Sequence, residues 1–323
     1  MKREIGKRED RDLYVIPKEE SDEKIAVARL SLYSNVSLTA LKLLAGGISG
    51  SVSIISEAIH SGMDLIASMI AYISVRVSGE PPDTMHAYGH GKYEDISGLI
   101  ESLLIIGAGL LIIYEAAKKL FHPHEIESSF LLIGIVVMGI SALINVFVSH
   151  RLMKTAKKTQ SIALESDAWH LRTDIYTSAG VMAGLIAMYC TGIALFDPLI
   201  ALTVAFFILK TGIDLTKRSY NALIDSSLSE SERSHIEALV SQYRNSFLNA
   251  HGFKTRRAGP EIFIEFHLVV DGAMSVLDAH TLLNTIEDVL HAACPRSTVT
   301  IHLEPCEGGC STCTSQCGER KFG

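Results

Sequence analysis

Long apolar stretches alternate with short polar segments along the first two thirds of the chain. A helix needs roughly 20 predominantly apolar residues to cross the hydrocarbon core of a bilayer. The third and fourth stretches are typical of lipid-facing helices, whereas the first, second and fifth carry polar and ionisable residues and are expected to form a functional core. The pattern predicts six membrane-spanning helices, at residues 25–47, 51–76, 96–119, 129–150, 168–190 and 195–216.

Beyond Asn221 the pattern becomes that of a water-soluble domain. Residues 229–248 show a helical period, residues 261–270 alternate as a strand does, and a second helix at 276–293 precedes a strand at 297–304. A helix, two strands, a helix and a strand predict a small α+β domain with its helices on one face of the sheet. The faces predicted to enter its core are Ile236, Leu239, Val240 and Tyr243; Ile262, Ile264, Phe266 and Leu268; and Val299, Ile301 and Leu303.

Charge and composition set the orientation and exclude one class of partner. The net charge of −7 argues against a nucleic-acid partner, which would require a basic face. Residues 1–24 are highly charged and lack the apolar core of a secretory signal, so we expect a cytoplasmic tail. The loops after the first and fifth spans carry no Lys or Arg, whereas the segment between the fourth and fifth spans is basic, which predicts that both termini are cytoplasmic. Its basic residues are Arg151, Lys154, Lys157 and Lys158.

Two His-to-Asp steps of four residues lie inside predicted spans, His60–Asp64 in the second and His170–Asp174 in the fifth. Residues four apart lie on one helix face, one turn apart. Two imidazoles and two carboxylates are enough to hold one tetrahedral divalent cation such as zinc. The alternative, two polar pairs that only pack helices together, is less expected because ionisable residues in a membrane usually mark a functional pathway. Glu57, one turn before His60, either orients that imidazole or faces a cavity.

Further metal-binding side chains occur outside the spans. Asp83, His86 and His90 lie in the segment EPPDTMHAYGHGKYED, where Gly89 and Gly91 allow a tight bend, and they form a metal site or a solvated polar loop. In the soluble domain the candidates are His251, His267, His280, His302 and Glu304, of which His302 and Glu304 share a strand face. Four cysteines in the tail, residues 306–323, could hold a soft ion or do little, namely Cys306, Cys310, Cys313 and Cys317.

The segments SEAIHSGMD, HAYGHGKYE and ESDAWHLRTD closely resemble the cation diffusion facilitator family, in particular its prokaryotic zinc and iron efflux members. The similarity extends from SLYSNVSLTALKLLAG to TIHLEPC, nearly the whole chain. The resemblance implies a six-helix transmembrane domain at 25–216, a cytoplasmic ferredoxin-like metal-binding domain at 217–305 and a homodimer in the inner membrane. It also implies exchange of cytoplasmic metal for protons.

By this resemblance, His60, Asp64, His170 and Asp174 match the family's transport site, and Asp83, His86 and His90 match a loop site of some members. His251, His267, His280, His302 and Glu304 match positions of a two-metal site at the cytoplasmic dimer interface. Lys92 and Asp225 match a charge pair that holds the helix bundle to that interface. Related iron and zinc transporters often carry Asp where this chain has His60, so the imidazole favours zinc; Glu304 replaces the usual Asp, and the cysteine tail lies outside the shared pattern.

The expected function is therefore a divalent cation/proton antiporter that exports Zn(II), with Fe(II), Co(II) and Cd(II) as further candidates. Zinc would be both its substrate and a regulatory ion. A membrane-anchored metal sensor or scaffold is the alternative, although a sensor has no need of ligands at mid-membrane depth. An enzyme is not expected, because His124–Glu125 does not continue into the H-E-x-x-H motif of a zinc hydrolase.

Overall fold

The structure is a computed structural model that describes residues 18–49, 52–121, 131–191 and 196–306. Within these ranges the side chains of residues 52–60 and 181–191, among others near helix ends, are not described. The chain divides into a unit ending at Asn221 and a unit beginning at Ala222. Each unit is considered by itself.

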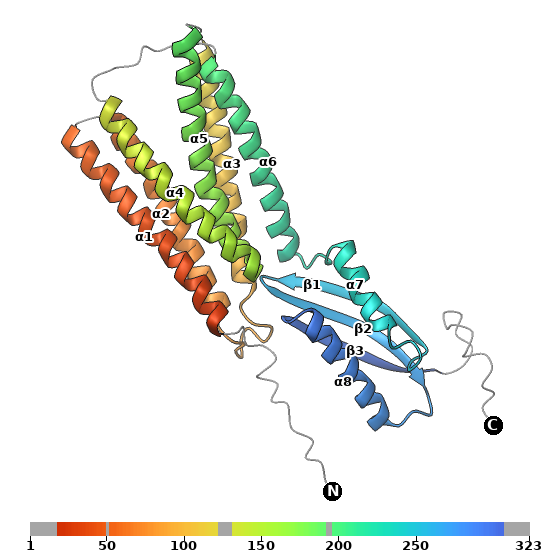
Figure 1. Cartoon of the computed structure of the whole chain (residues 1–323). Coiled ribbons are helices and arrows are strands. Elements are labelled where there is room, and N and C mark those ends of the chain that lie inside the picture. Colours follow the sequence, from red (N-terminus) through yellow and green to blue (C-terminus); the bar gives the residue numbers. More distant parts are fainter. Residues whose placement is uncertain (1–17, 50–51, 122–130, 192–195, 307–323) are drawn as a thin grey trace. The chain divides into compact units, whose positions relative to one another are not determined.

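The first unit consists of long helices (Figure 1). Each predicted span lies almost wholly within one helix, and most helices extend beyond the span by a polar turn or more. They are α1 (Lys18–Ser49), α2 (Val52–Ser78), α3 (Lys92–Phe121), α4 (Leu131–Thr159), α5 (Ile162–Thr191) and α6 (Phe196–Leu223).

Helix α5 lies at the centre of the packing, in contact with α4, α3 and α2, while α1 packs along α2 and α4. One buried apolar cluster joins α1, α2, α4 and α5 around fully buried Leu152 and Leu164. A second joins α3 to α6 through Ile105 and Ile208. There Gly212 permits the close approach, because a Cβ at this position would lie 2.8 Å from a side-chain carbon of Ile106. This packing holds the polar faces of α2 and α5 together.

Two of the described helical segments, Lys92–Lys118 and Pro198–Leu223, are long and apolar enough to cross a membrane. The expectation that the third span is simply lipid-facing is wrong. Helix α3 buries Glu94, Asp95, Ser97, Glu101 and Ser102 on one side, all at 0% exposure. Its apolar composition masks an inward polar stripe near the N-terminal end.

The basic segment between the fourth and fifth spans is helical rather than a loop. Helix α4 continues through Lys154, Lys157 and Lys158 to Thr159, and α5 begins at Ile162. Gln160, in the left-handed region at φ 54°, makes the break between them. Lysine side chains near a helix C-terminus interact favourably with its partial negative charge, which supports this extension.

A buried ion pair ties the helix ends together. Lys24 of α1 donates to Glu94 of α3, and the two residues are 1% and 0% exposed. The same carboxylate accepts hydrogen bonds from Ser78 at the end of α2, at 2.7 Å, and from Ser161 beside the start of α5. Breaking a buried ion pair leaves an uncompensated charge, which costs roughly 3–5 kcal/mol. Glu94 therefore fixes one end of the bundle.

The second unit is an α+β domain with a three-stranded sheet in the order β1-β2-β3. Strands β1 and β2 pair antiparallel, and β2 and β3 pair parallel. The connection between the parallel strands is helix α8, as a parallel pair requires. The elements are α7 (Glu230–Ser241), β1 (Asn249–Ala258), β2 (Glu261–Asp271), α8 (Val276–Ala293) and β3 (Ser297–Cys306).

The predicted apolar faces of this domain are confirmed. Ile264, Phe266 and Leu268 of β2 are fully buried and pack against Ile236 of α7 and Leu290 of α8. The other predicted core residues of α7, β2 and β3 line the same cluster.

The predicted end of the first helix, at residue 248, is wrong. Helix α7 stops at Ser241, and turns follow before β1 begins at Asn249. Asn245 and Ser246 are poor helix formers in this segment. Phe247 then turns into the core, where it is 7% exposed. Burial of the Phe247 side chain is thus favoured over continuation of the helix to residue 248.

Leu290→Ala should destabilise the second unit by about 2–5 kcal/mol, because it removes a fully buried side chain and leaves a cavity. Leu277→Ala, the same change on the same helix at a residue 68% exposed, is the matched control and should change stability by less than about 0.5 kcal/mol. Urea unfolding of the purified full chain in detergent, followed by circular dichroism, measures both. Equal effects of the two changes would contradict the assigned core.

Candidate metal centres

Asp64, His170 and Asp174 form a buried cluster between α2 and α5, with one ligand atom of each within 4.8 Å of the others. The Nε2 atom of His170 lies 3.1 Å from Oδ1 of Asp64, and both side chains are 8% exposed. Because the Nδ1 atom of His170 is buried without a described hydrogen-bond partner, the imidazole is not fully satisfied by the protein. Three of the four residues predicted for the membrane site are therefore brought together.

The fourth predicted ligand, His60, belongs to α2, but its side chain lies outside the described residues, as does that of Glu57. Its position four residues before Asp64 places it one turn away on the same helix face. His60 therefore remains a predicted ligand.

Two buried acids near this cluster were not predicted. Glu101 of α3 and Asp167 of α5 lie close enough to interact electrostatically with each other and with His170. Glu101 is one of two carboxylates within the predicted span 96–119, and an ionisable residue at such a position marks a functional site by default. That signal was present in the sequence and was hidden by the surrounding apolar residues.

The segment between α2 and α3 brings Asp83, His86 and His90 into a second cluster within the same 4.8 Å limit. The Nε2 atom of His90 lies 3.4 Å from Oδ2 of Asp83, and the Nδ1 atom of His86 lies 3.3 Å from Oδ1. His90 is buried at 7% exposure, so this histidine is not a solvated surface residue. Gly89, at φ 81°, makes the predicted bend.

Backbone hydrogen bonds shape this cluster. The N–H groups of His86 and Met85 donate to Oδ1 of Asp83, at 2.5 and 2.8 Å. The His86 bond is the largest cause that holds the pKa of the Asp83 carboxyl below its usual value. A carboxylate that stays ionised beside two imidazoles is a suitable donor set for a divalent transition metal.

In the second unit, three histidines form a row across the sheet. The register pairs His251 of β1 with His267 of β2, and His267 with His302 of β3. Their ring centroids are 5.2 and 5.0 Å apart along this row. Glu304 joins them, with Oε1 at 2.5 Å from Nδ1 of His267 and Oε2 at 3.6 Å from Nε2 of His251. His251, His267 and Glu304 satisfy the same 4.8 Å criterion.

A β-bulge places His251 in this row. The β1–β2 register shifts between His251 and Lys254, and Gly252 within it has φ +68°. A Cβ at Gly252 would lie 3.2 Å from Cδ2 of His267, so a glycine is needed both for the backbone and for the imidazole beside it.

The remaining predicted positions belong to none of the three clusters of described residues. His280 is exposed on α8 and is not part of the described cluster. Cys306 ends β3 and is buried, whereas Cys310, Cys313 and Cys317 lie outside the described residues, as do His124 and Glu125. Lys92 and Asp225 belong to different units, so their pairing stays a prediction; Asp225 contacts Arg256 of its own unit at 3.2 Å.

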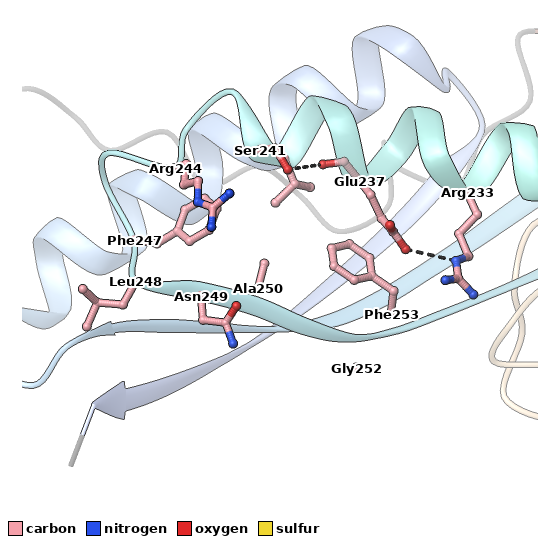
Figure 2. Close-up of a pocket in the computed structure, with 11 residues that line it drawn as sticks. Arg233, Glu237, Ser241, Arg244, Phe247, Leu248, Asn249, Ala250, Gly252 and Phe253 are labelled. Atoms are coloured by element: carbon pink, nitrogen blue, oxygen red, sulfur yellow. Dashed lines mark hydrogen bonds and ion pairs between the residues drawn. The ribbon is translucent and has the colours of Figure 1, made fainter. Parts of the chain in front are cut away.

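A cavity of about 460 Å³ is lined by residues of α7, β1 and the segment between them (Figure 2). Val240, Phe247 and Phe253 contribute apolar surface. Its rim includes Arg233, whose Nε donates to Glu237 at 3.0 Å. None of the three clusters contributes a ligand to this cavity.

His267→Ala should raise the pKa of Glu304 toward its ordinary value, because the hydrogen bond with His267 is the largest cause that lowers it. In the intact protein this interaction favours the folded state above the ordinary carboxyl pKa, and the contribution is lost as the pH falls through the lowered value. Carboxyl-carbon NMR of selectively labelled, metal-free full chain measures the titration. His235→Ala, at an exposed histidine of α7, should leave it unchanged; identical titrations in both variants would contradict the contact.

Comparison with known families accounts for most of the chain. The Cation efflux transmembrane domain matches residues 28–224, and the Cation efflux protein, cytoplasmic domain matches residues 228–306. The chain is 35% identical over 280 residues to an uncharacterized transporter of Synechocystis sp., covering 87% of this chain and 90% of that protein. It is 32% identical over 279 residues to the cation-efflux pump FieF of Shewanella oneidensis, covering 86% and 93%.

One of the similar solved structures is a zinc form of CzrB, a candidate zinc transporter. It is 41% identical and covers 30% of this chain and 99% of that chain, with a TM-score of 0.25. The family matches identify the first unit as a transmembrane domain and the second as a cytoplasmic domain. The chain is a cation efflux transporter of the cation diffusion facilitator family, and not an enzyme.

Proposed function

We propose that the protein exports Zn(II) from the cytoplasm in exchange for protons, at a tetrahedral site of His60, Asp64, His170 and Asp174. The observation that carries this proposal is the convergence of Asp64, His170 and Asp174 inside the helix bundle, within 4.8 Å of one another. Fe(II), Co(II) and Cd(II) are the other candidate substrates.

The donor set supports zinc. Mixed imidazole and carboxylate ligands suit Zn(II), whereas all-oxygen sets suit Mg(II), Ca(II) and Mn(II). The Nδ1 atom of buried His170 has no described hydrogen-bond partner in the protein. The similar CzrB structure is described as that of a candidate zinc transporter in its zinc form, which is consistent with the same class of ion.

Proton competition would drive the exchange. Metal ligands must be deprotonated, so metal affinity falls when His60 or His170 takes up a proton. An unperturbed imidazole titrates at about 6.5, within the physiological range. If the site opens alternately to the two sides, net transport requires only that the two states differ in proton and metal affinity.

The α2–α3 segment and the cytoplasmic domain would each bind additional metal during transport. Asp83, His86 and His90 would bind metal in the α2–α3 segment, and His251, His267, His302 and Glu304 would hold regulatory zinc in the cytoplasmic domain. In the proposed homodimer, exposed His280 would complete the cytoplasmic site of the partner subunit, and Lys92 would pair with Asp225. The six helices α1–α6 would all cross the inner membrane, with both termini cytoplasmic and a ferredoxin-like domain at 217–305.

Asp64→Asn should reduce zinc flux by at least about 100-fold, since even groups that only orient a metal ligand contribute 10–100-fold. Proteoliposomes loaded with a zinc-sensitive dye and a pH indicator measure metal and proton movement together. Asp214→Asn, the same change at an exposed position of α6, is the matched control and should transport normally.

The same assay separates transport from sensing. A membrane-anchored sensor or scaffold would bind zinc without moving it, in the wild-type protein as in the variant. If zinc flux in the wild type persisted in Asp64→Asn, Asp64 would not belong to the transport site. If neither protein moved zinc, the protein would instead be a membrane-anchored sensor or scaffold.

Glu304→Gln should raise the zinc concentration for half-maximal transport by about 5–150-fold, the range of a coupling of about 1–3 kcal/mol between two sites. The amide keeps the size of the side chain but loses the charge that faces His267 and His251. Glu265→Gln is the control, because Glu265 is exposed on the same face of β2 and is not part of the cluster. The same zinc dependence in both variants would show that the cytoplasmic cluster does not regulate transport.

A further inference from the structure

Two carboxylates in the helix bundle have no role in the proposed metal site. Glu101 of α3 is 0% exposed and Asp167 of α5 is 1% exposed. Neither is among the mutually close ligand atoms of Asp64, His170 and Asp174. Each acts electrostatically on the other and on His170. They are buried acids that lie next to the metal ligands without joining them.

These carboxylates lack compensation from the protein. Both oxygens of Asp167 and Oε2 of Glu101 are buried without a hydrogen-bond partner, and Oε1 of Glu101 accepts only the hydroxyl of Ser97, at 3.0 Å. Within the described ranges, neither acid has a Lys or Arg ion-pair partner. An unpaired charge in such surroundings is costly, so the pair must hold a proton or another cation.

A buried hydroxyl group of α1 lies next to one of these two carboxylates. Ser31 of α1 is 0% exposed, and its hydroxyl interacts with the carboxylate of Asp167 without the geometry of an ordinary hydrogen bond. Two acids and the Ser31 hydroxyl offer oxygen atoms only, and the nearby imidazole of His170 is already a proposed metal ligand. The donor set suits a proton shared between acids better than a second transition-metal ion.

We propose that Glu101 and Asp167 form a proton-binding site, separate from the metal ligands, that gives up its proton when a divalent cation binds at Asp64, His170 and Asp174. The proposal rests on the proposed metal/proton exchange and locates one of the exchanged protons. The proton would lie on one of the two carboxylates, and the charge of the other would favour its retention there. No covalent bond other than this O–H bond forms or breaks.

Electrostatics provides the coupling. The titratable groups that act on this pair from the neighbouring helices are His170 of α5 and Asp64 of α2, and Asp174 acts on His170 in turn. A bound dication at those ligands adds positive charge in a medium where charges interact strongly. It therefore favours the ionised form of Glu101 and Asp167, and by reciprocity a proton on the pair weakens metal binding.

The position of Asp167 along α5 is consistent with release of the proton toward the cytoplasm. Asp167 is one turn closer than His170 to the N-terminal end of α5, the end that loop charge predicts to face the cytoplasm. Metal that enters from the cytoplasm would displace a proton back toward the cytoplasm. An efflux exchanger requires this direction, and the proton need not share a ligand with the metal.

The test compares Glu101→Gln and Asp167→Asn with the wild-type full chain in detergent. The slope of the logarithm of apparent zinc affinity against pH gives the number of protons released per metal bound. We expect each variant to lower this slope by up to about one, because one titratable group is removed. The loop and cytoplasmic ligands are the same in the wild type and in both variants, so their contribution to the slope cancels in the comparison.

Glu115→Gln is the matched control, at an exposed residue of the same helix α3, and should keep the wild-type slope. In vesicles, stimulation of zinc flux by an opposing proton gradient should fall in Glu101→Gln but not in this control. Replacing an uncompensated buried charge by a neutral group of the same shape is not expected to unfold the bundle. Glu101→Gln is therefore decisive even if Asp167→Asn is unstable.

Two results would overturn the proton site. One is an unchanged slope in both variants, and the other is the loss of one bound zinc ion per chain in Glu101→Gln, which would make this acid a metal ligand. Absence of zinc flux in wild-type vesicles would instead overturn the proposed function, and the proton site as an element of exchange with it.

Discussion

Ionisable side chains buried among apolar helices must be compensated, and the transmembrane domain meets this constraint in two different ways. At one end of the bundle, Lys24 and Glu94 compensate each other, and Ser78 and Ser161 donate to the same carboxylate. This arrangement is complete within the protein and joins α1, α2, α3 and the start of α5. Deeper along α5, the buried acids Glu101 and Asp167 near His170 have no Lys or Arg ion-pair partner among the described residues.

This difference separates a structural group from a functional one. An ion pair whose hydrogen bonds are satisfied has no need of a ligand, so Glu94 is assigned to holding helices together. Asp64, Asp174, Glu101 and Asp167 place four carboxylates in one region with a single imidazole described among them. Of these four, Glu101 and Asp167 have buried oxygen atoms without a hydrogen-bond partner. In the proposed exchange, the metal ion and the proton would supply the positive charge to this region.

The sequence was informative where one helix or strand determines the outcome. The 3.6-residue and two-residue periods located the helices and the core faces of the cytoplasmic domain, and the four-residue steps identified Asp64, His170 and Asp174. The sequence was uninformative where the outcome depends on contacts between distant segments. Lys24 and Glu94 are 70 residues apart, and neither has a local pattern that indicates its partner.

The histidine row shows the same limit in the cytoplasmic domain. Strand alternation placed His302 and Glu304 on one face, but their approach to His251 depends on strand register. That register includes a bulge at Gly252, which periodicity cannot predict. A single glycine therefore decides whether the first strand, β1, contributes His251 to the cluster.

The first turn of α3 connects the loop cluster to the buried ion pair of Glu94. The backbone carbonyl of His90 accepts from the N–H of Tyr93 at 3.0 Å, and that of Gly91 accepts from the N–H of Glu94 at 3.1 Å. The loop cluster and the ion pair of Glu94 are therefore joined through the first turn of one helix. Glu101 lies two turns further along the same helix. Helix α3 therefore carries the end of the loop cluster, the ion pair of Glu94 and the buried acid Glu101 on one continuous element, although its apolar composition is typical of a lipid-facing helix.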